Sequence, residues 1–355
     1  MTLQRSQRVT QRTIAEMAGV SQATVSLVLN GKADATTRIP EATRRRVLDV
    51  IAETTYVADP AARSLAGVGN NLVGIFTYEH AFPNESSDFY TPLLMGIEGA
   101  AESVGVDLLM FTSAPVTGGR RQIFHEKNRL RLADGCLLLG REMDTSELMR
   151  LLESGYPFVA IGRRDGAPGT SKLIPYVGVD YVSATATLAR MALDSGHTRF
   201  AYLHLPIDAE STRDRQEGLA RMLVDTAVTV ESRASDGSDL KTAWVAIRSA
   251  APTVLFVEDP THAQTIVEIA ERDGVSIPGD LSIVVLGERT RPSDRATDYT
   301  RLSAPRPELG ARALALLDQL MNGARGAAEL PLQQLLECSI IPGTTLVAPR
   351  EARAL

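Results

Sequence analysis

From Leu72 onward, short apolar runs alternate with longer segments of amphipathic helical pattern. The runs have the length of single strands and read, in chain order, LVGIFTY, VDLLMFTS, CLLLG, PFVAIG, RFAYLHL, TVLFVE and SIVVLG. The segments between them include residues 91–105, 183–193, 213–223 and 262–272. Strands that alternate with helices in this way predict parallel sheets covered by helices on both faces. There are more of these strands than one sheet would hold.

Ahead of this region, residues 11–30 have the pattern of two short helices joined by a tight turn. The first helix carries a small apolar stripe formed by Ile14, Ala15 and Ala18. Gly19 follows the stripe, where glycine commonly ends a helix, and Ser21 is placed to cap a second helix. The sequence therefore predicts a turn at residues 19–21.

The second helix has one apolar face and one face left for contact with a partner. The inward residues are expected to be Val25, Val28 and Leu29, and the outward ones Gln22, Ala23, Ser26 and Leu27. This arrangement is typical of a helix-turn-helix, whose second helix lies in the major groove of DNA with its first residues at the base edges. An ordinary helical hairpin in an all-α domain is the alternative interpretation.

The composition is that of a soluble globular protein with room for two or three domains. The chain has 355 residues, of which 44% are hydrophobic and 23% charged. Cys136 and Cys338 are far apart and flanked by apolar residues, which predicts buried thiols in a reducing compartment. Residues 1–12 contain no apolar run, so we expect neither a signal peptide nor a membrane span there, and a cytoplasmic location.

The charge is divided unevenly along the chain. The formal net charge is −6, yet residues 1–66 contain nine Lys/Arg against six Asp/Glu. A basic head on an acidic body suits local contact with DNA phosphates. The run Arg44-Arg45-Arg46 belongs to this head, although such a run alone fits a solvated helix face equally well.

Together these segments resemble the lactose-repressor/galactose-repressor (LacI/GalR) family of bacterial transcription regulators. The resemblance lies in Thr13-Ile14-Ala15, Ala18-Gly19-Val20-Ser21, Thr24-Val25-Ser26 and Val28-Leu29-Asn30-Gly31, and in residues 41–56, 60–67, 177–180, 193–200 and 277–285. It implies an N-terminal all-α helix-turn-helix domain and an α/β effector domain like a periplasmic sugar-binding protein, with two parallel-sheet subdomains joined by three crossovers. It also implies a homodimer that binds a pseudo-palindromic operator.

Domain limits follow from the motifs and from the resemblance. We expect a DNA-binding domain over residues 1–58, a hinge over 59–69 and an effector-binding and dimerisation domain over 70–355. Within the last, the expected subdomains comprise residues 70–175 with 303–325, and residues 176–302 with 326–355. The C-terminal segment 347–355 contains Pro349 and is too short for a heptad helix, so a tetramer is not expected.

The hinge residues 60–66 open with proline, which favours a helix start, but are too few for a stable isolated helix. The resemblance implies that the hinge folds when two copies meet over the operator, with Leu65 inserted between bases of the minor groove. A plain linker whose leucine packs on the body is the alternative. The expected DNA-contacting residues are Thr10, Ser21, Gln22, Ala23, Thr24, Ser26, Leu27, Asn30, Arg38, Arg63, Leu65 and Ala66.

One residue of the second helix departs from the family. Leu27 stands where the family often has an arginine, so a two-point contact to guanine is missing at that position. Leucine suits a thymine methyl group instead, and we expect Gln22 to make the main polar base contact.

The candidate effector site follows from residues that come directly after the predicted strands, because ligands of α/β sheets bind at the carboxyl ends of strands. Carboxylates, an arginine and an aromatic ring suit a polyhydroxylated ligand. By the resemblance, the effector-contacting residues are Tyr78, Phe89, Asp165, Arg215, Glu258 and Glu288. Tyr90 is a further candidate, because its ring could stack on a base. Glu258-Asp259 and Glu288-Arg289 depart from the family's Asn-Asp and Asp-Asp, and Asp259 is expected to be a helix cap.

No catalytic constellation stands out, so we expect neither an enzyme, nor a cofactor, nor a metal. The histidines His80, His125, His197, His204 and His262 are dispersed, without a metal-binding spacing. The sequence lacks a Walker loop and a Gly-x-Ser-x-Gly elbow. A sugar-metabolising enzyme and an exported solute-binding protein remain as minor alternatives.

The sequence thus predicts a ligand-responsive regulator, a repressor of genes for sugar or polyol uptake or breakdown. Its partners would be double-stranded operator DNA, a small-molecule effector and a second copy of the chain, without a membrane. A nucleoside or purine effector is the alternative within this class, because Phe89 and Tyr90 could stack on a base. Inducer and corepressor both remain open.

Overall fold

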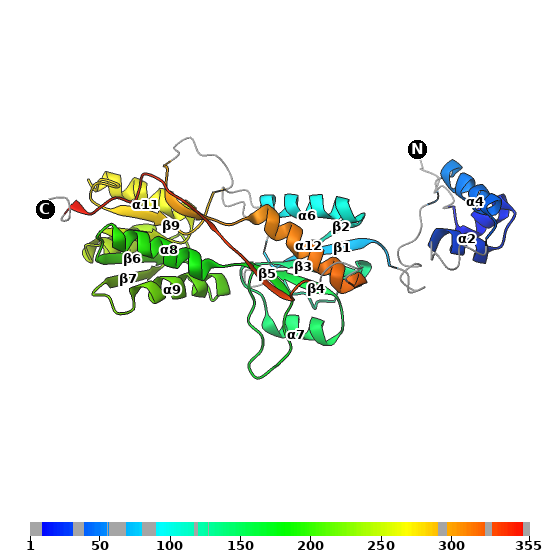
Figure 1. Ribbon diagram of the computed structural model, residues 1–355, viewed down its shortest axis with the longest axis horizontal. Helices are drawn as coiled ribbons and strands as arrows, with labels where there is room; N and C mark the ends of the chain where they lie inside the picture. The colour runs from blue at the N-terminus through cyan, green and yellow to red at the C-terminus, as the bar shows by residue number, and fades with distance from the viewer. Residues whose placement is uncertain are drawn as a thin grey trace. The chain divides into compact units, whose positions relative to one another are not determined.

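The chain forms two compact units, Met1–Asn70 and Asn71–Leu355, which Figure 1 draws as ribbons. The computed structural model describes residues 9–30, 39–54, 56, 69–79, 90–116, 120–126, 128–289, 297–323 and 329–350. Among these residues, no helix is both long enough and apolar enough to cross a membrane.

The first unit contains the predicted pair of helices and a further helix. They are α1 (Gln11–Ala18), α2 (Gln22–Asn30) and α4 (Glu41–Glu53). Thr10 caps α1 through a hydrogen bond that its side chain accepts from the Thr13 backbone nitrogen, and Gly19 ends the helix with a φ of 61°. The Ser21 hydroxyl accepts a hydrogen bond from the Thr24 backbone nitrogen at 3.1 Å. The predicted turn and its cap are confirmed.

The core of the first unit is small and apolar. Its buried side chains are Ile14, Ala15, Ala18, Val25, Val28 and Val47. Leu29 and Tyr56 are partly buried against them. The inward faces predicted for both helices are therefore confirmed.

The second unit contains two six-stranded sheets. The first has the order β11-β5-β4-β3-β1-β2 and is parallel throughout. Its strands are β1 (Leu72–Thr77), β2 (Asp107–Phe111), β3 (Gly135–Leu139), β4 (Phe158–Ile161), β5 (Tyr176–Val179) and β11 (Gln333–Leu336). The second has the order β12-β10-β9-β8-β6-β7, with only the pair of β10 and β12 antiparallel. Its strands are β6 (Arg199–His204), β7 (Thr229–Ala234), β8 (Val254–Val257), β9 (Ser282–Val285), β10 (Thr300–Ser303) and β12 (Ser339–Ile341).

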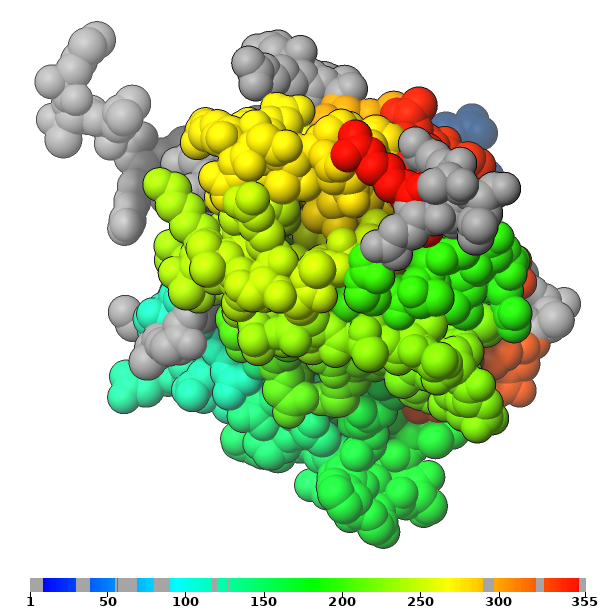
Figure 2. Space-filling model, turned by 90° about the vertical axis from the view of Figure 1, so that its left-hand side faces the viewer, coloured from blue at the N-terminus to red at the C-terminus, as the bar shows by residue number. Residues whose placement is uncertain are grey.

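Helices cover both faces of each sheet, as the alternating pattern predicts. The first sheet packs against α6 (Tyr90–Val104) and α12 (Arg306–Asn322) on one face and α7 (Thr145–Glu153) on the other (Figure 1). We call this assembly the first lobe. The second sheet packs against α8 (Tyr181–Asp194) and α9 (Glu210–Leu223) on one face and α10 (Leu240–Ser249) and α11 (Pro260–Arg272) on the other. We call it the second lobe, and Figure 2 views it from its end, where α11 is yellow and α8 and α9 are green.

The chain passes between the lobes three times, after β5, after β10 and after β11. The number of crossovers agrees with the expectation, but the subdomain limits need correction. Tyr176–Val179 and Gln333–Leu336 pair with each other in the first sheet, whereas the sequence placed both in the second subdomain. The sheet to which a strand belongs is decided by its backbone pairing with other strands. The sequence of either strand alone does not indicate this pairing.

Two glycines allow α6 and α12 to cross closely. A methyl group added at Gly96 would lie 1.9 Å from the Pro307 carbonyl oxygen, and one added at Gly310 would lie 2.3 Å from the Leu93 carbonyl oxygen. Because no carbon atom fits at these distances, the crossing requires glycine on both helices. This packing fixes the start of α12, which carries a residue of the site described below.

Candidate functional site

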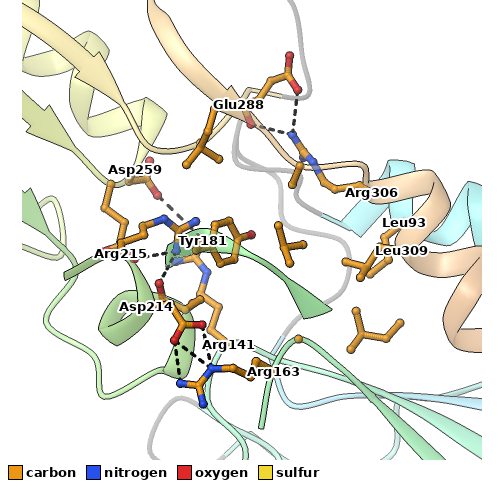
Figure 3. Close-up of a pocket in the computed structure, with 18 of the residues that line it drawn as sticks. Leu93, Arg141, Arg163, Tyr181, Asp214, Arg215, Asp259, Glu288, Arg306 and Leu309 are labelled. Carbon is orange, nitrogen blue, oxygen red and sulfur yellow. Dashed lines mark hydrogen bonds and ion pairs between the residues drawn. The ribbon is translucent and has the colours of Figure 1, made fainter. Parts of the chain in front are cut away.

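A pocket of about 150 Å³ lies in the second unit at the carboxyl ends of strands from both sheets. Residues that follow the strands line it, among them Gly140 after β3, Arg163 after β4, Tyr181 after β5, Glu258 after β8 and Glu288 after β9. Figure 3 shows several of these side chains around one space. Strand ends at a parallel sheet edge are the usual ligand sites of α/β folds. The pocket is therefore the candidate effector site.

Part of the pocket wall is aliphatic. It is formed by Leu93, Leu139, Ile161, Val179, Leu302 and Leu309. Tyr90 also lines the pocket, and its hydroxyl donates to the Glu79 carboxylate. Burial and the neighbouring Glu79 raise the pKa of Tyr90, so the hydroxyl stays protonated and can donate. This wall suits the apolar face of a ligand.

Arg215 is a buried cation held rigidly at the pocket wall. Its guanidinium lies 3.7 Å from the centre of the Tyr181 ring and donates to the carbonyl oxygens of Leu286 at 3.1 Å and Ser211 at 2.8 Å. Its Nη1 is 3.6 Å from a carboxylate oxygen of Glu258. Stacking and hydrogen bonds to carbonyls fix the direction of the charge.

Glu258 is buried and fully engaged by its own lobe. Its carboxylate accepts hydrogen bonds from the Thr212 hydroxyl at 2.7 Å, from the Tyr202 hydroxyl at 3.2 Å and from the Leu205 backbone nitrogen at 3.2 Å. These donors compensate for the cost of burying the charge. They also join the ends of β6 and β8 to α9.

Ion pairs connect the two lobes around the pocket. The pairs, with the first-lobe residue first, are Arg163–Asp214 at 2.8 Å, Arg164–Glu210 at 2.9 Å, Asp165–Arg213 at 2.8 Å, Arg141–Asp259 at 3.9 Å and Arg306–Glu288 at 3.9 Å. In most of them the first lobe supplies the arginine and the second lobe the carboxylate. The relative position of the lobes therefore depends on charge pairing at the cleft.

Arg164 is the most enclosed arginine of these pairs. Its side chain is 5% exposed. Its Nη1 donates to Glu210 and to the Arg163 carbonyl oxygen, and its Nη2 to the carbonyl oxygens of Gly140 and Ile161. This one side chain ties α9 of the second lobe to the ends of β3 and β4.

The structure brings together only part of the predicted effector set. Tyr90, Arg215, Glu258 and Glu288 line the pocket. Phe89 lies outside the described residues.

Two predicted residues lie elsewhere. Tyr78 is fully buried in the core between the first sheet and α7, where its hydroxyl donates to Glu147 at 3.3 Å. Asp165 is half exposed and pairs with Arg163 and Arg213 outside the pocket lining. Burial opposes the effect of these arginines, whose hydrogen bonds lower the pKa of Asp165. The structure therefore places neither side chain in the pocket lining.

Several lining residues escaped sequence reasoning, namely Arg141, Arg163, Arg164, Tyr181, Asp214, Arg289 and Arg306. Some had a usable signal, because Arg163 and Arg164 directly follow a predicted strand as Asp165 does. Asp214 lies inside α9, where the resemblance indicated only its neighbour Arg215. Asp259 caps α11, as expected, by accepting from the Thr261 backbone nitrogen at 2.7 Å, and it also lines the pocket.

The second candidate surface is the exposed side of α2. Gln22 and Ala23 are exposed, and Leu27 is 44% exposed although it is aliphatic. Ser26 and Thr24 are half-buried on the flanks. The remaining expected DNA contacts at Arg38, Arg63, Leu65 and Ala66 lie outside the described residues, and only the backbone of Asn30 is described.

Neither a metal site nor a reactive thiol emerges from the described part of the chain. No cluster of three potential metal ligands occurs among those residues. Cys136 is fully buried and Cys338 half-buried, and burial raises the pKa of each thiol. Thiols of this kind are inert.

Family models match the two units separately. Residues 10–59 match the model described as "Bacterial regulatory proteins, lacI family". Residues 189–346 match the model of a "Periplasmic binding protein-like domain". The first match spans α1, α2 and α4, and the second spans most of the second lobe.

Similar proteins cover nearly the whole chain. The HTH-type transcriptional regulator CelR of Thermobifida fusca is 27% identical over 350 residues, which cover 96% of this chain and 98% of CelR. Catabolite control protein A of Priestia megaterium is 25% identical, with 88% and 93% covered. The structure of the lac repressor dimer bound to operator and the anti-inducer ONPF has a TM-score of 0.73 at 20% identity, with 96% and 100% covered. That of a CelR–cellobiose complex has a TM-score of 0.65 at 21% identity, with 95% and 100% covered.

The helix-turn-helix unit, the two-lobed α/β unit with a pocket at its strand ends, and these matches agree with one another. This chain belongs to the LacI family of DNA-binding transcriptional regulators.

Proposed function

We propose that this protein is a repressor that binds a pseudo-palindromic operator as a homodimer and is controlled by a sugar or polyol in the pocket. The observation that carries the proposal is the pocket itself, at strand ends of both lobes and bounded by ion pairs between them. The cellobiose complex of CelR supports a carbohydrate effector. The target genes of this protein would serve uptake or breakdown of its sugar or polyol effector.

Control of DNA binding would work through the angle between the lobes. A ligand that contacts both walls of the pocket stabilises one relative position of the lobes over another. Three chain crossovers and the cleft ion pairs connect the lobes. Each lobe would therefore move as a rigid body relative to the other. A changed angle alters the separation of the two hinge segments in a dimer and so shifts operator affinity, typically by about 1–3 kcal/mol.

On the DNA side, α2 would read the major groove through Gln22, Ala23 and Leu27, whose exposure supports this role. Ser21, Thr24, Ser26, Thr10 and Asn30 would flank it. The hinge, proposed over residues 59–69 between a DNA-binding domain ending at 58 and an effector domain from 70, would place Leu65 in the minor groove. Arg38, Arg63 and Ala66 would contact the backbone and groove beside it.

We propose that the protein is not an enzyme and that it acts in the cytoplasm, where the operator lies. The relative CelR is named as a transcriptional regulator, which supports the first point. Nothing in this function needs a cofactor.

The experiment is a thermal-shift screen of the purified full chain with neutral sugars, polyols, sugar acids, sugar phosphates and nucleosides, followed by operator titration in the presence of each hit. A ligand that binds only the folded state raises the unfolding midpoint. We expect a carbohydrate hit that changes operator affinity at least fivefold. A response to nucleosides alone would replace the carbohydrate with a base-containing effector, and silence throughout would contradict ligand control.

The matched variants are Arg215→Ala and Arg190→Ala. Arg215 is a buried pocket arginine, whereas Arg190 is exposed on α8. We expect Arg215→Ala to abolish the effector response while operator affinity is retained, and Arg190→Ala to behave as wild type. An unchanged response in Arg215→Ala would remove this residue from the site.

A further inference from the structure

The described residues that line the pocket include more positively than negatively charged side chains. Among the described residues that line it, six are arginines and four are carboxylates. The arginines are Arg141, Arg163, Arg164, Arg215, Arg289 and Arg306. Arginine stays protonated at all physiological pH values. The positive charge of the wall is therefore permanent.

The four carboxylates are already engaged within the chain. Asp214 accepts two hydrogen bonds from the Nε of Arg163, at 2.9 and 3.0 Å. Asp259 caps α11, and Glu258 accepts from three donors of its own lobe. Glu288 accepts from the Ser303 hydroxyl and from Arg301 at 3.4 Å. Few acceptor positions remain for the hydroxyl groups of a neutral sugar.

At one side of the pocket, by contrast, two arginines share one carboxylate. Arg301 and Arg306 both face Glu288, with Arg306 Nη2 at 3.9 Å from its carboxylate and 2.9 Å from its carbonyl oxygen. Arg289 is the next residue, and its buried Nε has no hydrogen-bond partner among the described residues. A buried donor without a partner lowers the stability of the folded chain. A ligand acceptor would recover that stability.

Arg141 is the weakly paired arginine of the first lobe. Its side chain is 46% exposed, and its guanidinium comes only within 3.9 Å of Asp259. The other carboxylate oxygen of Asp259 caps α11. In Figure 3 Arg141 lies between Asp259 and Arg163, and Arg306 lies beside Glu288 at another side of the labelled group. The incompletely paired arginines are therefore Arg141 of the first lobe and Arg289 of the second.

We infer that the effector carries an anionic group, a carboxylate or a phosphate, which Arg141 and Arg289 receive. Bonds between guanidinium and an oxyanion are about twice as strong as neutral ones. An anion that contacts Arg141 from the first lobe and Arg289 from the second would favour one lobe arrangement. This inference rests on the proposed function, since it names the chemical class of that effector.

The test is calorimetric titration of the full chain with matched pairs of neutral and anionic probes. Glucose is paired with gluconate and glucuronate, which add a carboxylate, and with glucose 6-phosphate, which adds a phosphate. We expect at least one anionic probe to bind tenfold or more tightly than glucose, with affinity that falls as salt is added. The probe that binds shows which of the two anions is the source.

The variants are Arg141→Gln and Arg289→Gln, with Arg301→Gln as the control. Arg301 faces the same carboxylate but does not line the pocket. We expect each pocket variant to weaken the anionic probe at least tenfold, and the control to weaken it less than twofold. Thermal midpoints and retained operator binding verify that the variants fold.

Glucose that binds as tightly as its anionic partners would overturn the inference, as would equal losses in the control and the pocket variants, or the absence of binding by every anionic probe. Operator titrations separate this failure from failure of the proposed function. If neutral sugars still change operator affinity, the proposed regulatory function is retained and only the inferred anionic group of the effector is wrong.

Discussion

Arg163 and Asp214 form a paired contact between the two lobes, in which the Nε of Arg163 lies 2.9 and 3.0 Å from the two carboxylate oxygens and Nη2 lies 2.8 Å from one of them. Asp214 is 5% exposed and Arg163 is 24% exposed. Burial raises the pKa of Asp214, although Arg163 opposes the rise. The ion pair across the lobes thus offsets part of the cost of burying this carboxylate.

The first prediction concerns this pair. A double-mutant cycle with Arg163→Gln and Asp214→Asn is expected to give a coupling free energy of about 1–3 kcal/mol in urea unfolding, because both groups lose contact with water. The matched pair is Arg221–Glu217 on α9, whose side chains are 63% and 50% exposed. Its cycle is expected to give less than about 0.5 kcal/mol. Equal couplings in the two cycles would refute a special role for the contact between lobes.

The second prediction concerns the helix crossing. Gly96→Ala is expected to destabilise the protein by about 1–3 kcal/mol, because its methyl group would meet the Pro307 carbonyl oxygen at 1.9 Å. Gly99 lies on the same helix with nothing within 4 Å of an added methyl group. Gly99→Ala is expected to stabilise by about 0.5–1 kcal/mol through helix propensity. Unfolding followed by circular dichroism measures both, and a tolerated Gly96→Ala would contradict the crossing.

The third prediction concerns pH. His197 is 1% exposed, and its ring nitrogens bond to the Thr253 hydroxyl at 3.0 Å and the Val347 carbonyl oxygen at 2.9 Å. Burial lowers the pKa of His197 below the ordinary 6.5, although the Val347 carbonyl opposes the change. A lowered pKa means that the unfolded chain takes up the proton first. The stabilisation by neutral His197 is thus complete above 6.5 and declines as the pH falls below it.

The measurement is the unfolding midpoint of wild type and His197→Gln between about pH 8 and about pH 5. We expect the variant to be less stable at high pH, because it loses part of the bonding to Val347, and the difference to shrink on acidification. Carboxylates titrate in both proteins, so only the difference reports on His197. A constant difference across the range would show that His197 does not titrate in this way.

The fourth prediction concerns base recognition by α2. Leu27→Ala is expected to weaken operator binding about fivefold if Leu27 contacts a thymine methyl group. On an operator with uracil in place of thymine, the same substitution should have little effect. Met17 of α1, 56% exposed, provides the control, and Met17→Ala should leave affinity within twofold. Equal losses on thymine and uracil operators would remove the methyl contact.

The strands and helices that the sequence predicted are those with a strong apolar pattern. LVGIFTY became β1 and SIVVLG became β9, because both are buried along nearly their whole length. The sequence did not predict β7, because its TVESRA segment is mostly exposed and lacks an apolar run. β11 and β12 escaped because their sheet membership depends on pairing with distant residues.

The candidate site was predictable where side chains directly follow a strand, as with Glu258 and Glu288. It was not predictable at Asp214, which enters the pocket from inside α9. Tyr78 follows β1 as the rule requires, yet its side chain turns into the core and bonds to Glu147. Position after a strand fixes the backbone, whereas packing of α7 decides the side-chain direction.

The most direct measurement of the proposed function is selection of bound duplexes from a randomised DNA library by the full chain, followed by sequencing. We expect enrichment of an inverted repeat with two half-sites, because two copies of α2 would read DNA related by a two-fold axis. The enriched duplex should bind with nanomolar affinity that changes when the effector is added. Recovery of no enriched sequence, or of a single asymmetric site, would contradict a dimeric operator-binding regulator.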